Sequence, residues 1–178
     1  GIDGHVLADA VWGGSSTTPE IRVFQGTTAD RELVDEQSTV DFGYVELFPT
    51  TAETQTFTVQ NIGGNPDDLD THLQLSEPIQ LPSGFTLAAS YDWSTVAREG
   101  WLAPGESTTF TISVDAAAPG PVGGEVRLRN NDADETPFEF TLSADIGVQL
   151  VDNDNPGQPL DPGYPQFQLG AGNPAPFQ

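Results

Sequence analysis

The feature that most constrains the fold is a pair of alternating segments in the second half of the chain. Apolar Val126 and Leu128 alternate with charged residues, and beyond an acidic turn Phe138, Phe140 and Leu142 alternate with polar residues. An apolar residue at every second position is typical of a β-strand with one buried face and one solvent-exposed face. Residues 125–146 therefore predict a β-hairpin with a charged tip.

Shorter alternating segments precede this hairpin and predict that it belongs to a sandwich. No stretch shows the 3.6-residue apolar period of a long helix. About seven or eight short strands, separated by Gly- and Pro-containing turns, favour an all-β, antiparallel Ig-like β-sandwich over residues 19–146. Residues 117–124 are rich in Gly and Pro and are expected to form a turn. The other predicted strands contain Ile21–Val23, Val40–Phe42, Phe57–Val59, Leu73–Leu75, Phe85–Leu87 and Phe110–Val114.

Two extensions flank the predicted sandwich. Residues 1–18 contain a candidate strand with alternating apolar residues, followed by a flexible Gly/Ser/Thr linker. Residues 147–178 carry six prolines beyond position 155 and no regular pattern. This tail lacks the apolar content to fold alone and suits an extended segment laid on another surface. The apolar residues of the extensions are Val6, Ala8, Ala10 and Trp12 in the first and Leu160, Tyr164, Phe167, Leu169 and Phe177 in the second.

Charge excludes several classes of partner. The 178 residues include 27 acidic and 5 basic side chains, so that the formal net charge is -22. Such a charge repels phosphate backbones and anionic lipids, which argues against nucleic acid and membrane surfaces as partners. No apolar run has the length of a transmembrane helix, so we expect no membrane insertion. The start at Gly1 and the lack of methionine are expected of an exported, processed protein.

Six motifs in order carry a resemblance to a known family. They are Pro19–Val23, Thr39–Gly43, Thr56–Gly63, Leu81–Phe85, Leu102–Ile112 and Asn130–Phe140. Together they resemble the bacterial choice-of-anchor D domain, an Ig-like sandwich family of secreted and surface proteins. The resemblance implies a secreted, extracellular or cell-surface bacterial module without a catalytic role. The chain differs from the family in its single copy, its added N-terminal strand and its long tail.

Catalytic signatures are missing from the sequence. His5 and His72 are the only histidines, and there is no cysteine. The chain also lacks a nucleophile elbow, a Gly-rich phosphate loop and a zinc-binding His-Glu-x-x-His motif. We therefore expect a protein that is not an enzyme and needs no organic cofactor.

Oxygen-rich turns offer a candidate cation site. Asp132, Asp134 and Glu135 lie in one turn, and Asp152 and Asp154 lie in another. Carboxylates are preferred ligands of Ca²⁺, although neither turn matches the full EF-hand loop. Asp and Asn also favour turns for conformational reasons alone. Calcium binding is thus one interpretation, and simple turn formation is the other.

Aromatic residues near one loop suggest a carbohydrate-binding alternative. Tyr91, Trp93 and Trp101 could present a stacking platform for a sugar ring. Aromatic side chains also close the ends of sandwiches, where they pack against the core. The sequence leaves both interpretations open.

Self-assembly accounts for both extensions at once. The sandwich is predicted to be complete without them, and an extended segment can add to the edge of a neighbouring subunit's sheet. Head-to-tail contacts of this kind produce filaments, and the chain has no lysine for an isopeptide linkage. We expect a non-catalytic subunit of a non-covalent surface filament, a homopolymer joined by strand addition. The alternative is a monomeric surface adhesion or carbohydrate-binding module.

Overall fold

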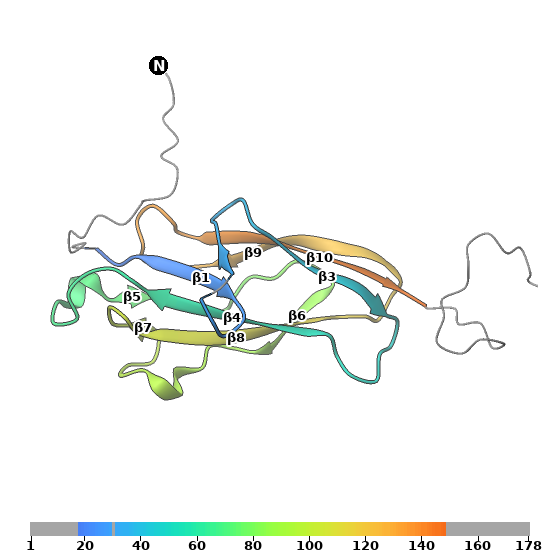
Figure 1. The fold of residues 1–178 in the computed structure, drawn as a ribbon, viewed down its shortest axis with the longest axis horizontal. Coiled ribbons are helices and arrows are strands. Elements are labelled where there is room, and N and C mark those ends of the chain that lie inside the picture. Colours follow the sequence, from blue (N-terminus) through green and yellow to red (C-terminus); the bar gives the residue numbers. More distant parts are fainter. Residues whose placement is uncertain (1–17, 30, 149–178) are drawn as a thin grey trace, which may run out of the picture. The chain divides into compact units, whose positions relative to one another are not determined.

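The computed structural model describes residues 18–29 and 31–148, which form a two-layer β-sandwich (Figure 1). Seven of its ten strands have five or more residues, and no α-helix occurs in these ranges, which confirms the predicted all-β class. The strands are β1 (Ile21–Gln25), β2 (Glu32–Leu33), β3 (Thr39–Glu46), β4 (Thr54–Asn61), β5 (Leu73–Gln74), β6 (Phe85–Ala89), β7 (Trp101–Leu102), β8 (Ser107–Val114), β9 (Gly120–Leu128) and β10 (Phe138–Gly147). Two single-turn 3₁₀-helices complete the set, η1 (Leu69–Thr71) and η2 (Trp93–Thr95).

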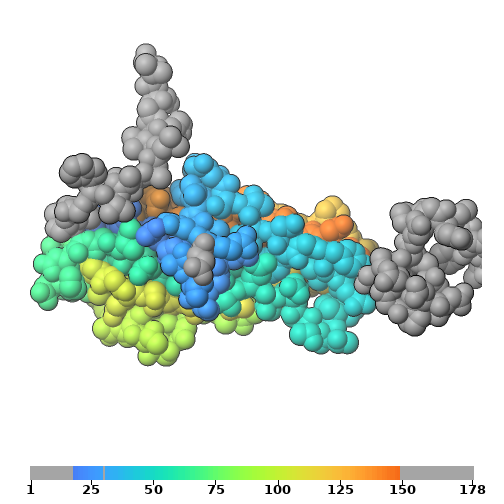
Figure 2. All heavy atoms as spheres, in the orientation of Figure 1, coloured from blue at the N-terminus to red at the C-terminus, as the bar shows by residue number. Residues whose placement is uncertain are grey.

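The strands form two main sheets. The five-stranded sheet has the order β2-β1-β4-β8-β6, with antiparallel neighbours throughout. The three-stranded sheet has the order β3-β10-β9, and β5 and β7 form a separate two-stranded sheet. Figure 1 shows β9 and β10 along one long side of the sandwich and β8 along the other, and Figure 2 shows the β1–β2 segment over the middle of the face in view. Each sheet buries one face in a shared core, as expected of a sandwich.

The predicted hairpin is confirmed. Strands β9 and β10 pair antiparallel, with Leu128 opposite Phe138 and Val126 opposite Phe140. All four side chains are buried, together with Leu142. Alternation in the sequence therefore identified the core face of both strands.

The segment 117–124 does not form only a turn, because β9 begins at Gly120. Its partner β10 continues to Gly147, so that Ile146 lies opposite Gly120. A side chain at Gly123 would place its Cβ 2.7 Å from the backbone oxygen of Leu142. Glycine here permits the close approach of two strands. In sequence alone, such glycines cannot be distinguished from glycines that form a turn.

Strand β3 departs from the predicted antiparallel arrangement, because it pairs in parallel with β10. The chain crosses from β2 to the other sheet through residues 34–38, where the Glu36 N–H donates to the Glu139 oxygen at 2.9 Å. The next contact joins the Thr141 N–H to the Ser38 oxygen, also at 2.9 Å. Strand β9 occupies one side of β10, so β3 pairs with the other side. Because β3 begins near the start of β10, with Thr39 opposite Thr141, the two strands run in the same direction.

The core is centred on aromatic residues from both sheets. Phe57 of β4 is fully buried and stacks on Phe110 of β8, with ring centroids 5.2 Å apart. Phe140 of β10 approaches Phe57 from the opposite sheet, also with a centroid separation of 5.2 Å. Phe57 thus links the two layers.

Both predicted extensions lie mostly outside the described residues. The described part of the chain contains no helix that could span a bilayer. Outside the described residues are the predicted assembly residues and the second acidic turn, namely Val6, Ala8, Ala10, Trp12, Asp152, Asp154, Leu160, Tyr164, Phe167, Leu169 and Phe177.

Candidate functional site

Three carboxylates meet where the first strand begins. Glu20 immediately precedes β1, while Asp132 and Glu135 lie in the turn between β9 and β10. One carboxylate oxygen of each lies within 4.8 Å of the other two. Asp132 is only 1% exposed, and the other two side chains are partly buried. Asp132 and Glu135 of the predicted acidic turn therefore lie beside Glu20, which is more than 100 residues earlier in the chain.

Hydrogen bonds fix the acidic turn against β1. The Ile21 N–H donates to Oδ2 of Asp132 at 2.8 Å, and the Asp132 N–H donates to Oδ1 of Asn130 at 2.7 Å. The Asn130 side-chain amide then donates to the backbone oxygens of Leu128 and Glu135, at 3.1 and 2.8 Å. The Asp132 carboxylate is thus held by the backbone of β1, and the Asp132 N–H by the side chain of Asn130.

A buried asparagine holds the same end of the sandwich together. Asn61, at the end of β4, is fully buried. Its Oδ1 accepts from the N–H groups of Glu20 and Gly63, at 3.2 and 3.0 Å. Its Nδ2 donates to the backbone oxygens of Thr71 and Leu102, at 2.9 Å each. One side chain therefore satisfies four backbone groups from separate segments.

Burial, reinforced by neighbouring negative charges, raises the proton affinity of Glu135 and Asp132. Burial raises the pKa of Glu135 to about 7, helped by the negative charges of Asp132, Asp35, Glu20 and Asp134. Burial also raises the pKa of Asp132 to about 6, partly offset by the hydrogen bond from Ile21. Within the described ranges, no hydrogen-bond donor reaches the buried Oε2 of Glu135.

This arrangement can hold either a proton or a hard cation. Three carboxylates would supply only part of the six to eight oxygen ligands that Ca²⁺ takes, and water would supply the rest. Asp134, from the predicted set, lies close enough for its negative charge to contribute to the raised pKa of Asp132. Glu20 was not predicted, because nothing in its local sequence separates it from the other acidic residues.

The proton affinity of Glu135 makes stability depend on pH. A glutamate in an unfolded chain ionises near pH 4.3. Because the folded-state pKa of Glu135 is higher, at about 7, the folded protein binds more protons between the two values. Stability should therefore fall as the pH rises through that window. Replacement Glu135→Gln should stabilise the fold at pH 8 by about 1–2 kcal/mol, a value reduced for the partial solvent access of the side chain.

Thermal or urea unfolding at pH 4 and pH 8 measures this effect. At pH 4 the wild type carries a protonated Glu135, so Glu135→Gln should change the free energy of unfolding little. The exposed Glu99→Gln serves as the matched control. If calcium occupies the cluster, adding about 5 mM Ca²⁺ at pH 8 should stabilise the wild type more than it stabilises Glu135→Gln. Equal stabilisation by Glu135→Gln at both pH values would contradict the assignment of a raised pKa.

The three candidate sugar-binding aromatics do not share one exposed face. Tyr91 is buried and meets Phe110 edge-on at a centroid distance of 5.6 Å. Trp93 packs on Tyr91 at 5.2 Å. Trp101 carries the guanidinium of Arg98 at 4.6 Å from its ring centroid. Packing at the end of the core and a cation–π contact account for these rings.

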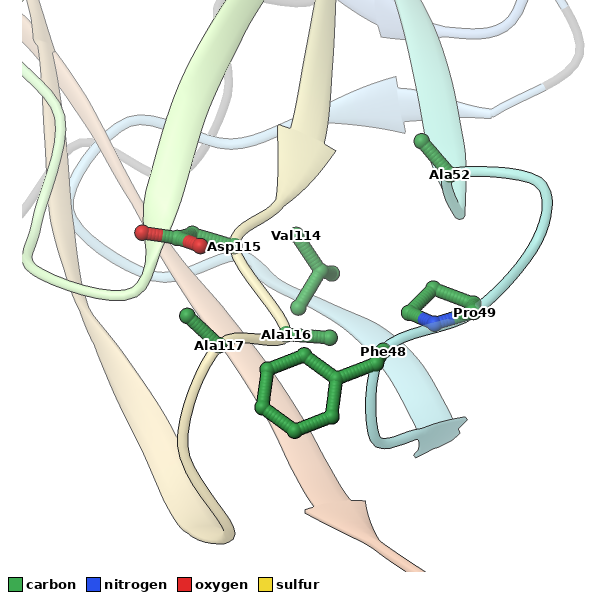
Figure 3. A pocket seen from close by; sticks show the side chains of 7 residues that line it. All are labelled: Phe48, Pro49, Ala52, Val114, Asp115, Ala116 and Ala117. Carbon is green, nitrogen blue, oxygen red and sulfur yellow. The ribbon is translucent and has the colours of Figure 1, made fainter.

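A shallow hollow of about 260 Å³ lies beside the β8–β9 connection (Figure 3). Phe48, whose side chain is 72% exposed, faces Val114 and Ala116 there. Asp115 is the only titratable residue of the lining, and its carboxylate points away from the Phe48 ring. A single carboxylate in an open hollow supplies neither an acid–base pair nor a set of metal ligands.

Comparisons with known proteins give limited likenesses. No protein-family model matches the chain, and no curated protein matches it, so the resemblance to the choice-of-anchor D domain stays a prediction. Among solved structures, it is similar to the VesB protease of Vibrio cholerae, with 22% identity, a TM-score of 0.42 and coverage of 62% of this chain and 30% of that one. A Porphyromonas gingivalis W83 protein of unknown function gives 14% identity, a TM-score of 0.48 and coverage of 74% and 49%.

A third similar structure is the ASH/PapD-like domain 7 of human CEP192. It shares 13% identity at a TM-score of 0.47, over 84% of this chain and 99% of that one. The chain spans 30% and 49% of the length of the first two proteins, so the activity of those whole proteins is not carried over to it.

Proposed function

We propose that this chain is a non-catalytic, Ig-like structural module of a bacterial secreted or surface protein, and that copies of it join by strand addition. The donor in this proposal is the N-terminal segment 5–12. The acceptor is an open sheet edge on the next copy. Neither a catalytic step nor a cofactor is needed.

The observation that carries the proposal is the closure of the core without either extension. Residues 18–29 and 31–148 contain both sheets and a continuous apolar core. Fully buried residues from four different strands, Val23, Phe57, Phe110 and Phe140, contribute to that core. The described residues therefore need no further segment to fill this core, which supports a role for residues 5–12 in contact with another copy.

Backbone pairing suits the chemistry of the chain. An added strand gains main-chain hydrogen bonds and needs no reactive side chain. The chain contains neither lysine nor cysteine, so isopeptide and disulfide linkages between copies are excluded. Copies of charge -22 repel one another, which favours contact through segments with few charges.

Removal of residues 1–17 should abolish assembly and leave a folded monomer. Electron microscopy of the full chain should show filaments, and the deletion variant should show none. Circular dichroism and thermal unfolding should confirm that the variant retains a cooperative β fold. Filaments formed by the deletion variant would overturn the proposed donor.

Point variants sharpen this test. Trp12→Asp places a charge on the apolar side of the segment and should prevent assembly as the deletion does. Asp9→Asn, on the other side of the alternation, is the matched control and should assemble normally.

The carbohydrate-binding alternative finds less support, because Tyr91 is buried and Arg98 lies over Trp101.

A further inference from the structure

We propose that the outer edge of β6 is the surface that receives residues 5–12 of a second copy. This inference rests on the proposed strand addition and names its acceptor. It follows from a comparison of the strand edges that the structure describes, because most of them are already occupied or protected.

Two of these edges offer little room. Strand β2, at one end of the five-stranded sheet, has only two residues. Strand β9, at one end of the three-stranded sheet, is paired at Arg127, which exchanges backbone hydrogen bonds of 3.0 and 3.2 Å with Gln80. Pro121 of β9 has no N–H to offer. A new strand would find few free backbone groups at either place.

The third edge, that of β3, is protected by its own side chains. The Asp41 carboxylate accepts from the Gly43 N–H at 2.9 Å, and the Gln55 amide contacts the Asp41 backbone oxygen at 3.4 Å. Gly43 has a φ of 71°, which interrupts the extended backbone. Asp41 and Glu46 add two exposed negative charges. Charges and irregular backbone are common protections against edge-to-edge pairing.

Strand β6 lacks the charges that protect β3, although its pairing with β8 shifts register between Leu87 and Ala89. It pairs with β8 on one side only, with Thr86 opposite Ser113 and Leu87 opposite Ile112. Its residues Phe85–Ala89 include no charged side chain, and Thr86, Ala88 and Ala89 are exposed. Across the described ranges, the Phe85 N–H donates to the Pro82 oxygen at 3.3 Å, and no backbone hydrogen bond reaches β6 from any strand other than β8.

The chemistry of the donor matches this edge. Residues 5–12 include one acidic side chain, Asp9, in a chain that has 27. An edge without charge is where two acidic copies meet the least repulsion. Backbone groups of β6 that point away from β8 would pair with the added strand and extend the five-stranded sheet.

A second copy fits this edge better than the chain's own N-terminus. The sheet order places β4, β8 and β6 between β1 and a strand added outside β6, a separation of about 19 Å at the usual strand spacing. The six linker residues 13–18 span at most about 20 Å when fully extended. Docking on the chain's own β6 would therefore require an almost taut linker across three strands, whereas a neighbouring copy imposes no such limit.

Cysteine pairs test the contact directly, because the chain contains no cysteine of its own. Full-length Ala10→Cys, or Ala8→Cys to allow for register, is mixed with full-length Ala88→Cys under mild oxidation. A disulfide forms only if the two Cα atoms approach within about 7 Å. The mixture should yield on the order of tenfold more disulfide-linked heterodimer than a matched mixture with Thr39→Cys on β3, since docking raises the local thiol concentration.

The possible outcomes separate the acceptor from the proposed function. Linkage to Thr39→Cys instead of Ala88→Cys would overturn β6 as the acceptor and leave strand addition in place. Filaments without linkage to Ala88→Cys would do the same. An intrachain disulfide in the double variant Ala10→Cys/Ala88→Cys, found at monomer mass, would overturn the role of a second copy. A wild-type chain that stays monomeric, with no linkage at all, would overturn both proposals.

Discussion

Replacement Phe57→Ala is expected to lower the free energy of unfolding by about 3–5 kcal/mol. Phe57 is fully buried and contacts Phe110 in its own sheet and Phe140 in the opposite one. Its loss removes apolar burial and leaves a cavity that neighbouring strands cannot close without moving. Since domains of this size are stabilised by about 5–15 kcal/mol, one such change removes a large part of the total.

Urea unfolding followed by tryptophan fluorescence measures this effect. The matched control is Phe48→Ala, which deletes the same side chain from a site that is 72% exposed. We expect the control to change the free energy of unfolding by less than about 1 kcal/mol. Similar losses for both variants would contradict the placement of Phe57 between the two sheets.

Replacement Asn61→Ala is expected to cost about 3–4 kcal/mol, because it leaves four backbone groups without their partner. These groups are the N–H of Glu20 and Gly63 and the backbone oxygens of Thr71 and Leu102. Asn61→Asp should also destabilise, since a carboxylate cannot donate to the two carbonyl oxygens. The loss should appear as a lower unfolding midpoint in urea and as faster hydrogen exchange at the start of β1.

The control for this prediction is Asn65→Ala. Asn65 is exposed on the loop after β4, and its side chain accepts one hydrogen bond, from the Asp67 N–H at 3.1 Å. We expect that change to cost about 0.5–1 kcal/mol. If Asn61→Ala cost no more than Asn65→Ala, the role of Asn61 at this end of the sandwich would be wrong.

Local sequence patterns predicted most of the sheet structure. Alternation placed Phe110, Ile112 and Val114 of β8 in the core, and all three are buried. The parallel pairing of β3 with β10 could not be predicted in this way, because alternation shows which face is buried and not which strand is adjacent. Nor could the strand at Gly120–Gly124, where glycine serves close strand approach and resembles a turn in sequence.

The acidic site was predicted in part. Asp132 and Glu135 share one turn, so their proximity followed from the sequence. Glu20 joins them through the tertiary fold, since the Ile21 N–H binds Asp132 from the other end of the domain. Among the aromatic residues, Tyr91 is buried against Phe110, and only the packing of the two sheets determines this.

The central claim is that the sandwich folds by itself while the N-terminal segment joins copies. Light scattering of the full chain and of the variant lacking residues 1–17, at equal protein concentrations, tests it most directly. We predict a molar mass of many subunits for the full chain and close to one subunit for the variant, with cooperative unfolding in both. Equal masses for the two proteins, or an unfolded variant, would contradict the account.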